Sequence, residues 1–394
     1  MVDTDLLIGQ YIDTYLPAID GVVITVQNYA RWLNSDHFPC YVATTEAGRA
    51  HRDTEPYQII RYRSVPLLRR PPYRFGVPML DRRFRSAQHQ IYPNLVHAHS
   101  PFFAGAEARR LARQRKIPLV ASFHSKYYDD ILQATGSSLL AEKAVSRIIA
   151  FYHSADVVWT VNQTTAGTLR DYGFKNSIEI MPNGTDSFLE IDHEAACKQV
   201  NQRLGLNPQE KVILFVGQHI LQKNLMMLLD AVRLYAQNYG HFRLLMVGEG
   251  YARNDLIERA AELGLSDYVI FVGMERDRKT LFTLYHRADL FAFPSLYDTS
   301  GLVVKEAAMA KCPSVMIEGS NAAEGAIDGY NSYLCQNNAD SLCSAIHRAL
   351  SRDDERRAAG QMAQATLAKP WRSILLDVAD RYRTIMQEYQ ARLQ

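Results

Sequence analysis

Short apolar runs alternate along most of the chain with longer segments in which apolar residues recur three and four positions apart. The runs are rich in β-branched and aromatic residues and predict strands buried on both faces, whereas the segments predict amphipathic helices. Such alternation is typical of doubly wound α/β folds with parallel sheets. The expected strands are, in chain order, DLLIGQYI, CYVATT, QIIRY, NLVHAHS, PLVASFHS, DVVWTVN, SIEIMPNG, KVILFVG, RLLMVGEG, YVIFVG, DLFAFPS and PSVMIEG.

A polar stretch from about Asp192 to Glu210 separates two rounds of this alternation. The chain has 394 residues, which is too long for one ordinary core, because a domain holds roughly 100 to 200 residues. We therefore expect two Rossmann-like domains, over residues 1–200 and 201–370. The final stretch, residues 371–394, predicts one long helix that Pro370 opens at its first turn.

The composition, 47% hydrophobic and 22% charged, is that of a globular protein with full-sized cores. The N-terminal stretch MVDTDLLIGQY lacks the basic and apolar regions of a secretory signal. No apolar run approaches the roughly 20 residues that span a bilayer. The five cysteines form no C-x-x-C pair, which argues against a zinc or disulfide framework. We therefore expect a cytoplasmic protein in a reducing compartment.

The charge is uneven although the formal net charge is only +2. Residues 61–90 carry eight arginines against the single Asp81, with aromatic residues between them. Such a patch suits an anionic surface such as lipid head groups or an acidic acceptor, although a solvated arginine-rich loop remains an alternative. Nucleic acid is not expected, because no nucleic-acid motif accompanies the patch. The residues assigned to an acceptor or membrane patch are Arg69, Arg70, Arg74, Arg82, Arg83 and Arg85.

Asp298 and Glu306 lie eight positions apart in SLYDTSGLVVKEAAMA, directly after the apolar run DLFAFPS. The stretch predicts a helix that begins near Ser300 and Gly301, at the sheet edge where open α/β folds bind ligands. The amides and dipole of a helix start favour an anion, and two carboxylates suit sugar and ribose hydroxyls. The same spacing also fits an Asp298 that caps the helix and a Glu306 on the surface. Spacing leaves both interpretations open.

Motifs in both halves of the chain favour the interpretation in which Asp298 and Glu306 bind a ligand. FPSLYDTSGLVVKEAAMAKCPSV resembles the signature of retaining glycosyltransferases of family 4, which have the GT-B fold, and the resemblance covers nearly the whole chain. YLPAIDGV resembles the family's glycine loop, SFHS the strand end with its active-site histidine, MPNGTD the end of the first domain and FVGQHILQKN the start of the second; VGEG and FVGM resemble the next two strand ends.

The resemblance implies a fold and a separate binding function for each domain. It implies that two Rossmann-like domains face a cleft and that the C-terminal helix returns to the N-terminal domain. The first domain would bind the acceptor and the second a nucleotide sugar. No metal or other cofactor is expected to be required.

Residue roles also follow from the resemblance. Gly21 would let the first loop approach the diphosphate, His124 would hydrogen-bond a hydroxyl of the donor sugar, and Lys223 would neutralise diphosphate charge. Asp298 would bind sugar hydroxyls, and Glu306 would hold the ribose. The donor-binding set is completed by Gln218, Ser300, Gly301 and Leu302.

Two positions depart from the family pattern. Many members have glutamate where this chain has Asp298, and many have arginine after VG where this chain has Gln218. With a neutral amide at that position, Lys223 carries more of the leaving-group charge unless another residue substitutes. The neighbouring His219 is a candidate.

Three other features carry weaker signals. His97 and His99 end a predicted strand, where a role on the acceptor side and a structural role are equally compatible with the pattern. The D-T-D at residues 3–5 precedes the first strand and is not expected to bind a metal. VGEGYA lacks the last glycine of G-x-G-x-x-G, which makes a dinucleotide-dependent dehydrogenase a distant alternative.

HAHSPFFAG, FHSKYYDD and EGSNAAEG are similar to segments of bacterial diacylglycerol glucosyltransferases. This similarity suggests a peripheral enzyme at the inner face of the cell membrane that moves glucose from UDP-glucose to a lipid such as diacylglycerol. No residue is a convincing nucleophile, so retention by front-face attack is expected. Two alternatives remain: a transferase acting on a soluble or cell-wall polysaccharide, and a catalytically silent sugar-nucleotide-binding subunit, suggested by Asp298 and Gln218.

Overall fold

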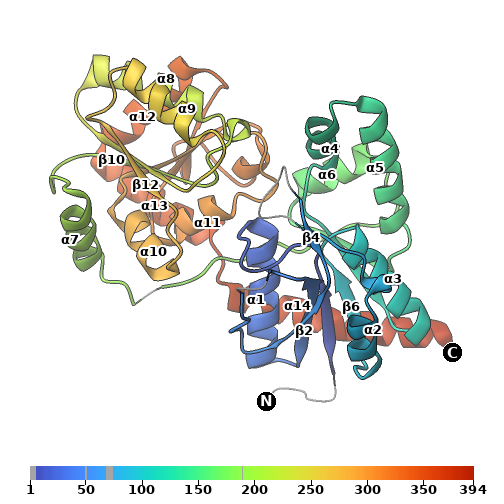
Figure 1. Ribbon diagram of the computed structural model, residues 1–394. Helices are drawn as coiled ribbons and strands as arrows, with labels where there is room; N and C mark the ends of the chain where they lie inside the picture. The colour runs from blue at the N-terminus through green and yellow to red at the C-terminus, as the bar shows by residue number, and fades with distance from the viewer. Residues whose placement is uncertain (1–5, 49–50, 68–73, 189) are drawn as a thin grey trace. The chain divides into compact units, whose positions relative to one another are not determined.

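The computed structural model describes residues 6–48, 51–67, 74–188 and 190–394. It divides the chain into two compact units, of which the first comprises residues 1–183 and 371–394 and the second residues 184–370. Each unit contains its own parallel sheet with helices packed around it (Figure 1). The expectation of two doubly wound α/β domains is confirmed.

Seven parallel strands form the sheet of the first unit, in the order β3-β2-β1-β6-β7-β8-β9. The order reverses at β1, where Gln10 lies between Val42 of β2 and His97 of β6. Open α/β sheets bind ligands at the carboxyl edge of such a reversal. The strands are β1 (Ile8–Tyr11), β2 (Cys40–Thr45), β3 (Gln58–Tyr62), β6 (Leu95–Ala98), β7 (Leu119–Phe123), β8 (Val157–Thr160) and β9 (Glu179–Ile180).

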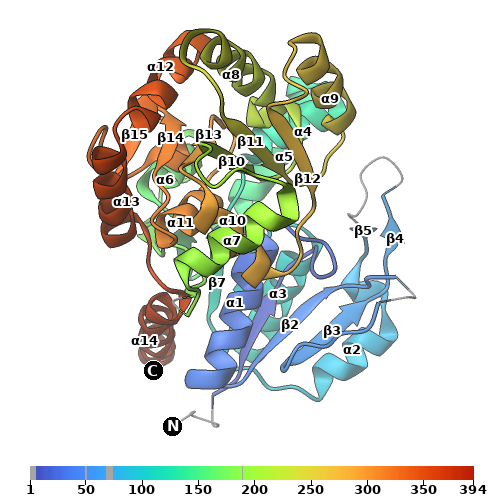
Figure 2. The ribbon, with the colours of Figure 1, turned by 90° about the vertical axis from the view of Figure 1, so that its left-hand side faces the viewer.

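Helices flank this sheet on both faces (Figures 1 and 2). A two-stranded antiparallel hairpin, β4 (Val65–Pro66) and β5 (Arg74–Phe75), projects from the same unit next to the short 3-10 helix η1 (Pro78–Leu80). The helices are α1 (Gly21–Asp36), α2 (Arg82–His89), α3 (Phe103–Arg115), α4 (Tyr127–Thr135), α5 (Ser138–Tyr152), α6 (Gln163–Asp171) and α14 (Trp371–Leu393).

The C-terminal helix α14 belongs to the first unit, as expected. Its apolar residues recur with the helical period, and Trp371, Leu375, Val378 and Tyr382 are all buried. The Tyr382 ring stacks on Trp159 of β8, with the ring centroids 5.3 Å apart and the planes inclined by 12°. The last 24 residues therefore complete the core of the unit in which the chain begins.

The second unit has six parallel strands in the order β12-β11-β10-β13-β14-β15, which is the Rossmann order. Its reversal lies at β10, which pairs with β11 on one side and β13 on the other. The strands are β10 (Val212–Val216), β11 (Arg243–Val247), β12 (Val269–Gly273), β13 (Leu290–Phe293), β14 (Ser314–Ile317) and β15 (Ser332–Cys335). The helices are α7 (His193–Leu204), α8 (Leu225–Tyr239), α9 (Arg253–Glu262), α10 (Arg278–Arg287), α11 (Leu302–Met309), α12 (Ala339–Leu350) and α13 (Asp353–Leu367), with 3-10 helices η2 (Leu221–Lys223) and η3 (Asn321–Ala323).

The boundary between the units lies at Asn183 and Gly184, not at residue 200 as predicted from the sequence. The polar stretch that was expected to link the domains contains helix α7, which packs on α10. Val200 joins the apolar core of the second unit, and Asn201 accepts a hydrogen bond from Arg287 at 2.6 Å. Residues 184–200 therefore belong to the second unit, because α7 buries its few apolar side chains there.

The sequence pattern missed the edge strand β15 and the hairpin of β4 and β5. The hairpin strands VP and RF have two residues each, and β15 (SYLC) lies between polar stretches, so none of them forms a continuous apolar run in the sequence. Within the residues that the structure describes, no helix is long and apolar enough to cross a membrane.

Candidate active site

The strand reversal of the second unit brings Lys223 and Asp298 together. Lys223 ends η2, which follows β10, and Asp298 lies in the loop after the adjacent strand β13. The Lys223 Nζ lies 2.5 Å from both Asp298 Oδ1 and Oδ2. Lys223 is only 8% exposed, and its ammonium also lies 5.3 Å from the centroid of the Phe293 ring. A charged pair is thus held at the carboxyl edge where Rossmann-like sheets bind phosphates.

Helix α11 begins four residues after Asp298, at Leu302. Its N-cap is Gly301, at φ 55°, a residue without a side chain that could accept from the first-turn amides. A Cβ at Gly301 would lie 3.0 Å from the Ala322 Cβ, so this position needs glycine for space as well as for its left-handed backbone. The N-cap is thus Gly301 and not Asp298, whose carboxylate pairs with Lys223. The helix start retains its positive potential for an anion.

Glu306 is buried one and a half turns into α11, at 3% exposure, so its interpretation as a surface residue is also wrong. Its Oε1 accepts a hydrogen bond from Arg278 Nη2 at 2.5 Å and its Oε2 accepts one from the Tyr285 hydroxyl at 2.9 Å. Arg278 Nε in turn donates to Asp186 at 3.0 Å. The buried carboxylate is thus matched by one cation and one hydroxyl, which makes it rigid.

Sequence reasoning did not select Arg278 or Tyr285. The signal for Arg278 is its place at the start of α10, five positions after Gly273 at the end of β12 and therefore at the carboxyl edge of the sheet. The signal for Tyr285 is weaker, because a tyrosine on an apolar helix face usually indicates core packing. Only the tertiary contact with Glu306 identifies it.

The loops after β10, β11 and β12 pack closely against one another at glycine residues. Gly217 N donates to Val247 O at 3.0 Å, and Gly248 N donates to Gly273 O at 2.8 Å. A side chain at Gly248 would clash with the Gly217 carbonyl, and one at Gly250 would clash with the backbone of His219. The glycines of VGQH and VGEG therefore allow close packing between loops.

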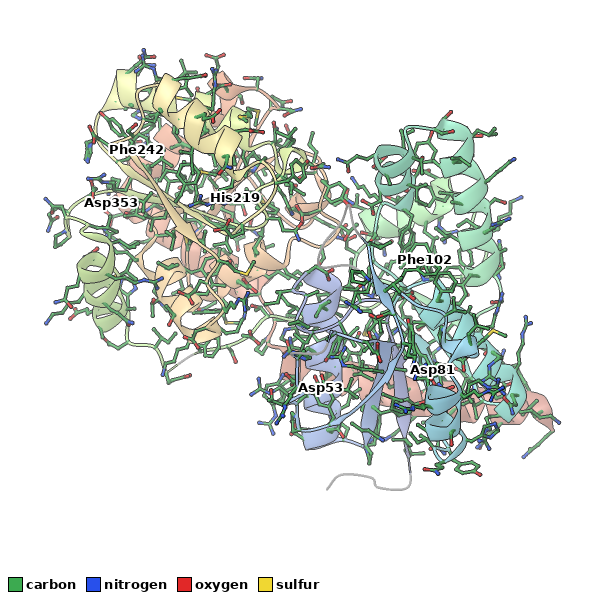
Figure 3. All side chains as sticks on the ribbon, in the orientation of Figure 1. Asp53, Asp81, Phe102, His219, Phe242 and Asp353 are labelled. Atoms are coloured by element: carbon green, nitrogen blue, oxygen red, sulfur yellow. The ribbon has the colours of Figure 1, made fainter. Side chains whose placement is uncertain are left out.

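Gln218 and His219 follow β10 with opposite exposure. Gln218 is exposed, whereas His219 is fully buried inside the second unit (Figure 3). Burial, together with the nearby Arg253 charge, lowers the pKa of His219 to about 4. His219 is therefore neutral at physiological pH, so it does not replace the cation missing at Gln218. Among the described residues, neither ring nitrogen of His219 has a hydrogen-bond partner.

In the first unit, His124 directly follows β7 and is 7% exposed. Its Nε2 lies 3.1 Å from the Nδ1 of His99, and the two rings are stacked. His97 is fully buried, with its Nε2 2.7 Å from Ser122 Oγ and its Nδ1 2.5 Å from the Tyr382 hydroxyl. His97 is thus part of the core, and His99 supports His124.

Gly21 is the first residue of α1 in the first unit, and the Asp20 side chain caps that helix. The Asp20 carboxylate accepts hydrogen bonds from the backbone N–H groups of Val22 and Val23, at 3.0 and 2.9 Å. A carboxylate thus satisfies two amides beside the glycine that was predicted to approach a diphosphate. The role of Gly21 stays a prediction.

The arginine-rich stretch divides into residues with different surroundings. Arg69 and Arg70 lie outside the described residues. Arg74 donates from Nε and Nη2 to the Oγ and carbonyl oxygen of Ser64, at 2.8 and 2.9 Å. The other three patch arginines are exposed on α2, and within the described chain no ion pair joins them to a carboxylate; they are Arg82, Arg83 and Arg85.

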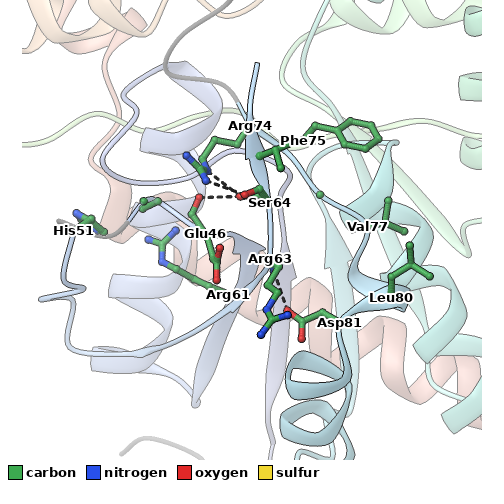
Figure 4. Close-up of a pocket in the computed structure, with 14 residues that line it drawn as sticks. Glu46, His51, Arg61, Arg63, Ser64, Arg74, Phe75, Val77, Leu80 and Asp81 are labelled. Atoms are coloured by element: carbon green, nitrogen blue, oxygen red, sulfur yellow. Dashed lines mark hydrogen bonds between the residues drawn. The ribbon is translucent and has the colours of Figure 1, made fainter. Parts of the chain in front are cut away.

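The hairpin borders a cavity of about 1000 Å³ in the first unit (Figure 4). Glu46, Arg61 and Arg63 line one side, and Val77 and Leu80 line the other. The cavity therefore offers charged and apolar walls together. Within the described ranges, no group of three or more His, Cys, Asp or Glu side chains is arranged to hold a metal ion, and the expected independence from metal stays a prediction.

Comparisons with known proteins match both units to glycosyltransferase families. Residues 198–366 match the profile described as glycosyl transferases group 1, and residues 19–187 match that of glycosyltransferase family 4. The two matched ranges contain all of the catalytic and donor-site positions predicted from the sequence.

Similar sequences include two named enzymes. The chain is 27% identical to the alpha-monoglucosyldiacylglycerol synthase of Streptococcus pneumoniae, over 92% of this chain and 79% of the relative. It is 23% identical to the Acholeplasma laidlawii enzyme of the same name, over 86% of this chain and 87% of the relative. Among solved structures, the Anabaena protein HepE in complex with UDP and glucose has a TM-score of 0.77 and 18% identity, over 96% of this chain and 99% of HepE.

Proposed function

Because this chain belongs to the group 1 glycosyltransferases of family 4, which have the GT-B fold, we propose that it transfers glucose from UDP-glucose to a diacylglycerol hydroxyl, with retention of configuration. The observation that carries the proposal is the Lys223–Asp298 pair close in sequence to the start of α11, whose N-cap is Gly301. That arrangement presents a cation, a carboxylate and helix amides at one sheet edge. These are the groups that a sugar diphosphate requires.

Lys223 and the α11 amides would stabilise the diphosphate as it leaves. Negative charge develops on the phosphate oxygen when its bond to the anomeric carbon breaks, and preorganised donors lower the barrier to that step. The Lys223 charge is balanced by Asp298. The diphosphate would therefore replace Asp298 as the ion-pair partner of Lys223. The Asp298 oxygens would then accept hydrogen bonds from the sugar hydroxyls.

Glu306 would bind the ribose without losing its present partners. Each of its oxygens accepts one hydrogen bond, from Arg278 or from Tyr285, and a carboxylate has about four acceptor sites. Two acceptor positions thus remain for the ribose hydroxyls. Arg278 and Tyr285 would act by holding the carboxylate in one orientation.

Retention would follow from attack on the face that the diphosphate leaves. The acceptor oxygen forms a bond to the anomeric carbon, the bond from that carbon to the phosphate oxygen breaks, and the acceptor proton passes to the departing phosphate oxygen. His124 would hydrogen-bond a sugar hydroxyl and orient the ring. This scheme needs neither an enzymic nucleophile nor a metal ion.

The lipid acceptor is supported by the S. pneumoniae and A. laidlawii relatives and by the surface of the first unit. The hairpin and η1 expose a group of apolar side chains beside the α2 arginines: Val65, Leu67, Phe75, Met79 and Leu80, the last of them 81% exposed. Apolar side chains next to unpaired arginines suit the interface of an anionic membrane. A peripheral location at the membrane would bring the enzyme to its acceptor.

A transfer assay tests donor, acceptor and stereochemistry together. We expect radiolabelled UDP-glucose with diacylglycerol vesicles to give a lipid-extractable α-glucoside, identified by the small anomeric coupling in its proton NMR spectrum. GDP- and ADP-glucose serve as parallel donors, and a soluble glucan serves as the competing acceptor. Lys223→Ala should lower kcat at least about a hundredfold. Label confined to aqueous products, or a β-glucoside, would contradict the proposal.

A further inference from the structure

Arg278 joins Glu306 to a second carboxylate, that of Asp186. All three residues belong to the second unit, with Asp186 near its start, Arg278 at the first position of α10 and Glu306 in α11. Arg278 Nε donates to Asp186 Oδ2 at 3.0 Å, and Arg278 Nη2 donates to Glu306 Oε1 at 2.5 Å. One guanidinium therefore serves two carboxylates that lie far apart in the sequence.

This division of the guanidinium affects the hydrogen bonds of Glu306. Two N–H groups on one edge of a guanidinium commonly bind both oxygens of a single carboxylate. Here Asp186 takes the Nε–H, so Glu306 receives one hydrogen bond from Arg278, and its other oxygen accepts from the Tyr285 hydroxyl at 2.9 Å. Without Asp186, both N–H groups would turn to Glu306 and fill an acceptor position that a ribose hydroxyl needs.

Asp186 is itself held in place by the segment around it. The backbone N–H of Thr185 donates to the Lys369 carbonyl at 2.8 Å, and the Thr185 hydroxyl donates to the Asp186 carbonyl at 3.3 Å. The Phe188 ring packs edge-on against Phe282 of α10, with the ring centroids 4.8 Å apart. The Asp186 side chain is 19% exposed. These contacts make Asp186 a fixed acceptor for Arg278.

We infer that Asp186, acting through Arg278, keeps an acceptor position of Glu306 available to the ribose and thereby sets the preference of the site for ribonucleotides. The inference rests on the proposed function, in which Glu306 binds the ribose of UDP-glucose. Asp186 and Arg278 are positioning residues, because they reach the nucleotide only through Glu306. A site built to bind a hydroxyl rejects the analogue that lacks it, so nucleotide preference reports how Glu306 is presented.

A purely structural role of Asp186 predicts a different result. If Asp186 only stabilised the second unit, its loss would lower the affinities for UDP and for deoxy analogues of UDP by the same factor. If Asp186 presents Glu306 to the ribose, its loss lowers the affinity for UDP more than the affinity for the analogue. The ratio of the two affinities therefore separates these roles.

Isothermal titration calorimetry of the full chain with UDP, 2′-deoxy-UDP and 3′-deoxy-UDP measures this ratio. The wild type should bind UDP at least about tenfold more tightly than the analogue whose missing hydroxyl contacts Glu306. Asp186→Leu, which has a similar size but no acceptor oxygen, should reduce the ratio severalfold. Asp186→Asn keeps an acceptor oxygen for Arg278 Nε and should retain most of the ratio.

Arg278→Lys supplies a second test if Asp186→Leu does not fold. A lysine ammonium lacks the planar fork of donors that serves both carboxylates, so the ratio should fall in this variant too. The matched control is Asp230→Leu, which removes the carboxylate that pairs with Arg259 at 2.8 Å elsewhere in the second unit and should keep the wild-type ratio.

Three results would overturn the inference. They are a wild-type ratio in every folded variant of Asp186 and Arg278, an equal fall of the ratio in Asp230→Leu, and a wild type that binds UDP no more tightly than either analogue. A wild type that distinguishes UDP from an analogue but transfers no glucose refutes only the proposed function.

Discussion

At the scale of single residues, the buried contacts of Glu306 decide which substitution can test its role in binding. Glu306→Ala would take one of its two carboxylates from the partly exposed Arg278 and would leave the buried Tyr285 hydroxyl without its acceptor, and an unsatisfied buried donor costs about 1–3 kcal/mol. Loss of binding in that variant would therefore be confounded with unfolding. Glu306→Gln keeps the shape and one acceptor oxygen, which makes it the more informative substitution.

We expect Glu306→Gln to weaken UDP binding by about tenfold or more, because a hydrogen bond to a charged group contributes about 1.5–3 kcal/mol. Isothermal titration calorimetry with UDP measures this change. Tyr285→Phe is the control, since it removes the hydroxyl that Glu306 already binds and leaves the carboxylate charge in place. Equal affinities of the wild type and Glu306→Gln would show that Glu306 is only structural.

The pKa of His124 predicts a pH dependence of stability. The folded protein holds the pKa at about 4 against the ordinary 6.5, so the unfolded chain binds more protons between these values. The contribution of neutral His124 to the free energy of unfolding is complete above pH 6.5 and is lost as the pH falls toward 4. From pH 7.5 to pH 5 it amounts to about 2 kcal/mol, at about 1.4 kcal/mol per pH unit below 6.5.

Urea unfolding of the wild type and of His124→Gln at these two pH values checks the size of that loss. The variant should lose about 2 kcal/mol less than the wild type over the interval. His153→Gln, which removes an exposed imidazole, should follow the wild type. If the wild type and His124→Gln lose the same unfolding free energy between the two pH values, His124 is not held neutral by the fold.

At the scale of elements, the start of α11 depends on the backbone of Gly301. An alanine there meets both a left-handed φ of 55° and the Ala322 side chain. The left-handed conformation alone costs about 1–2 kcal/mol for a residue with a Cβ. We expect Gly301→Ala to lower the melting temperature and to weaken UDP-glucose binding, because the amides of the first turn move.

Gly167 in α6 provides the matched control for this prediction. It lies inside a helix with no atom within 4 Å of an added Cβ. Gly167→Ala should stabilise the protein by roughly 0.5–1 kcal/mol and leave binding unchanged. Thermal unfolding and calorimetry on both variants separate the two cases. Unchanged UDP-glucose affinity in Gly301→Ala would show that the start of α11 does not contact the donor.

At the scale of the whole molecule, the exposed apolar and basic surface predicts how the protein partitions onto membranes. We expect co-sedimentation with vesicles that contain anionic lipid, and less binding as salt is raised, because surface charges are screened over about 10 Å at 0.1 M ionic strength. Leu80→Asp should reduce binding severalfold. Leu376→Asp changes an exposed leucine on α14, far along the chain from the hairpin, and should bind like the wild type. Equal loss in both variants would refute a specific docking surface.

The sequence was sufficient for the architecture, and it selected Lys223 and Asp298, which the fold brings together; their roles in donor binding stay predictions. Runs such as VILFV and LFAF are continuously apolar because both faces of a parallel sheet are covered, so their strands could be located without coordinates. The sequence did not locate the boundary between the units. Helix α7 has a polar composition, and only its packing on α10 assigns it to the second unit.

The sequence by itself determined two parallel α/β units, the strand ends that carry His124, Lys223 and Asp298, and membership of a glycosyltransferase family. These features depend on local periodicity and on motif spacing, which are properties of the chain. Only the tertiary structure decided that Asp298 pairs with Lys223, that Glu306 is matched by Arg278 and that His219 is neutral. Partners, burial and protonation depend on residues far apart in sequence, because they arise only where the fold brings side chains together and excludes water.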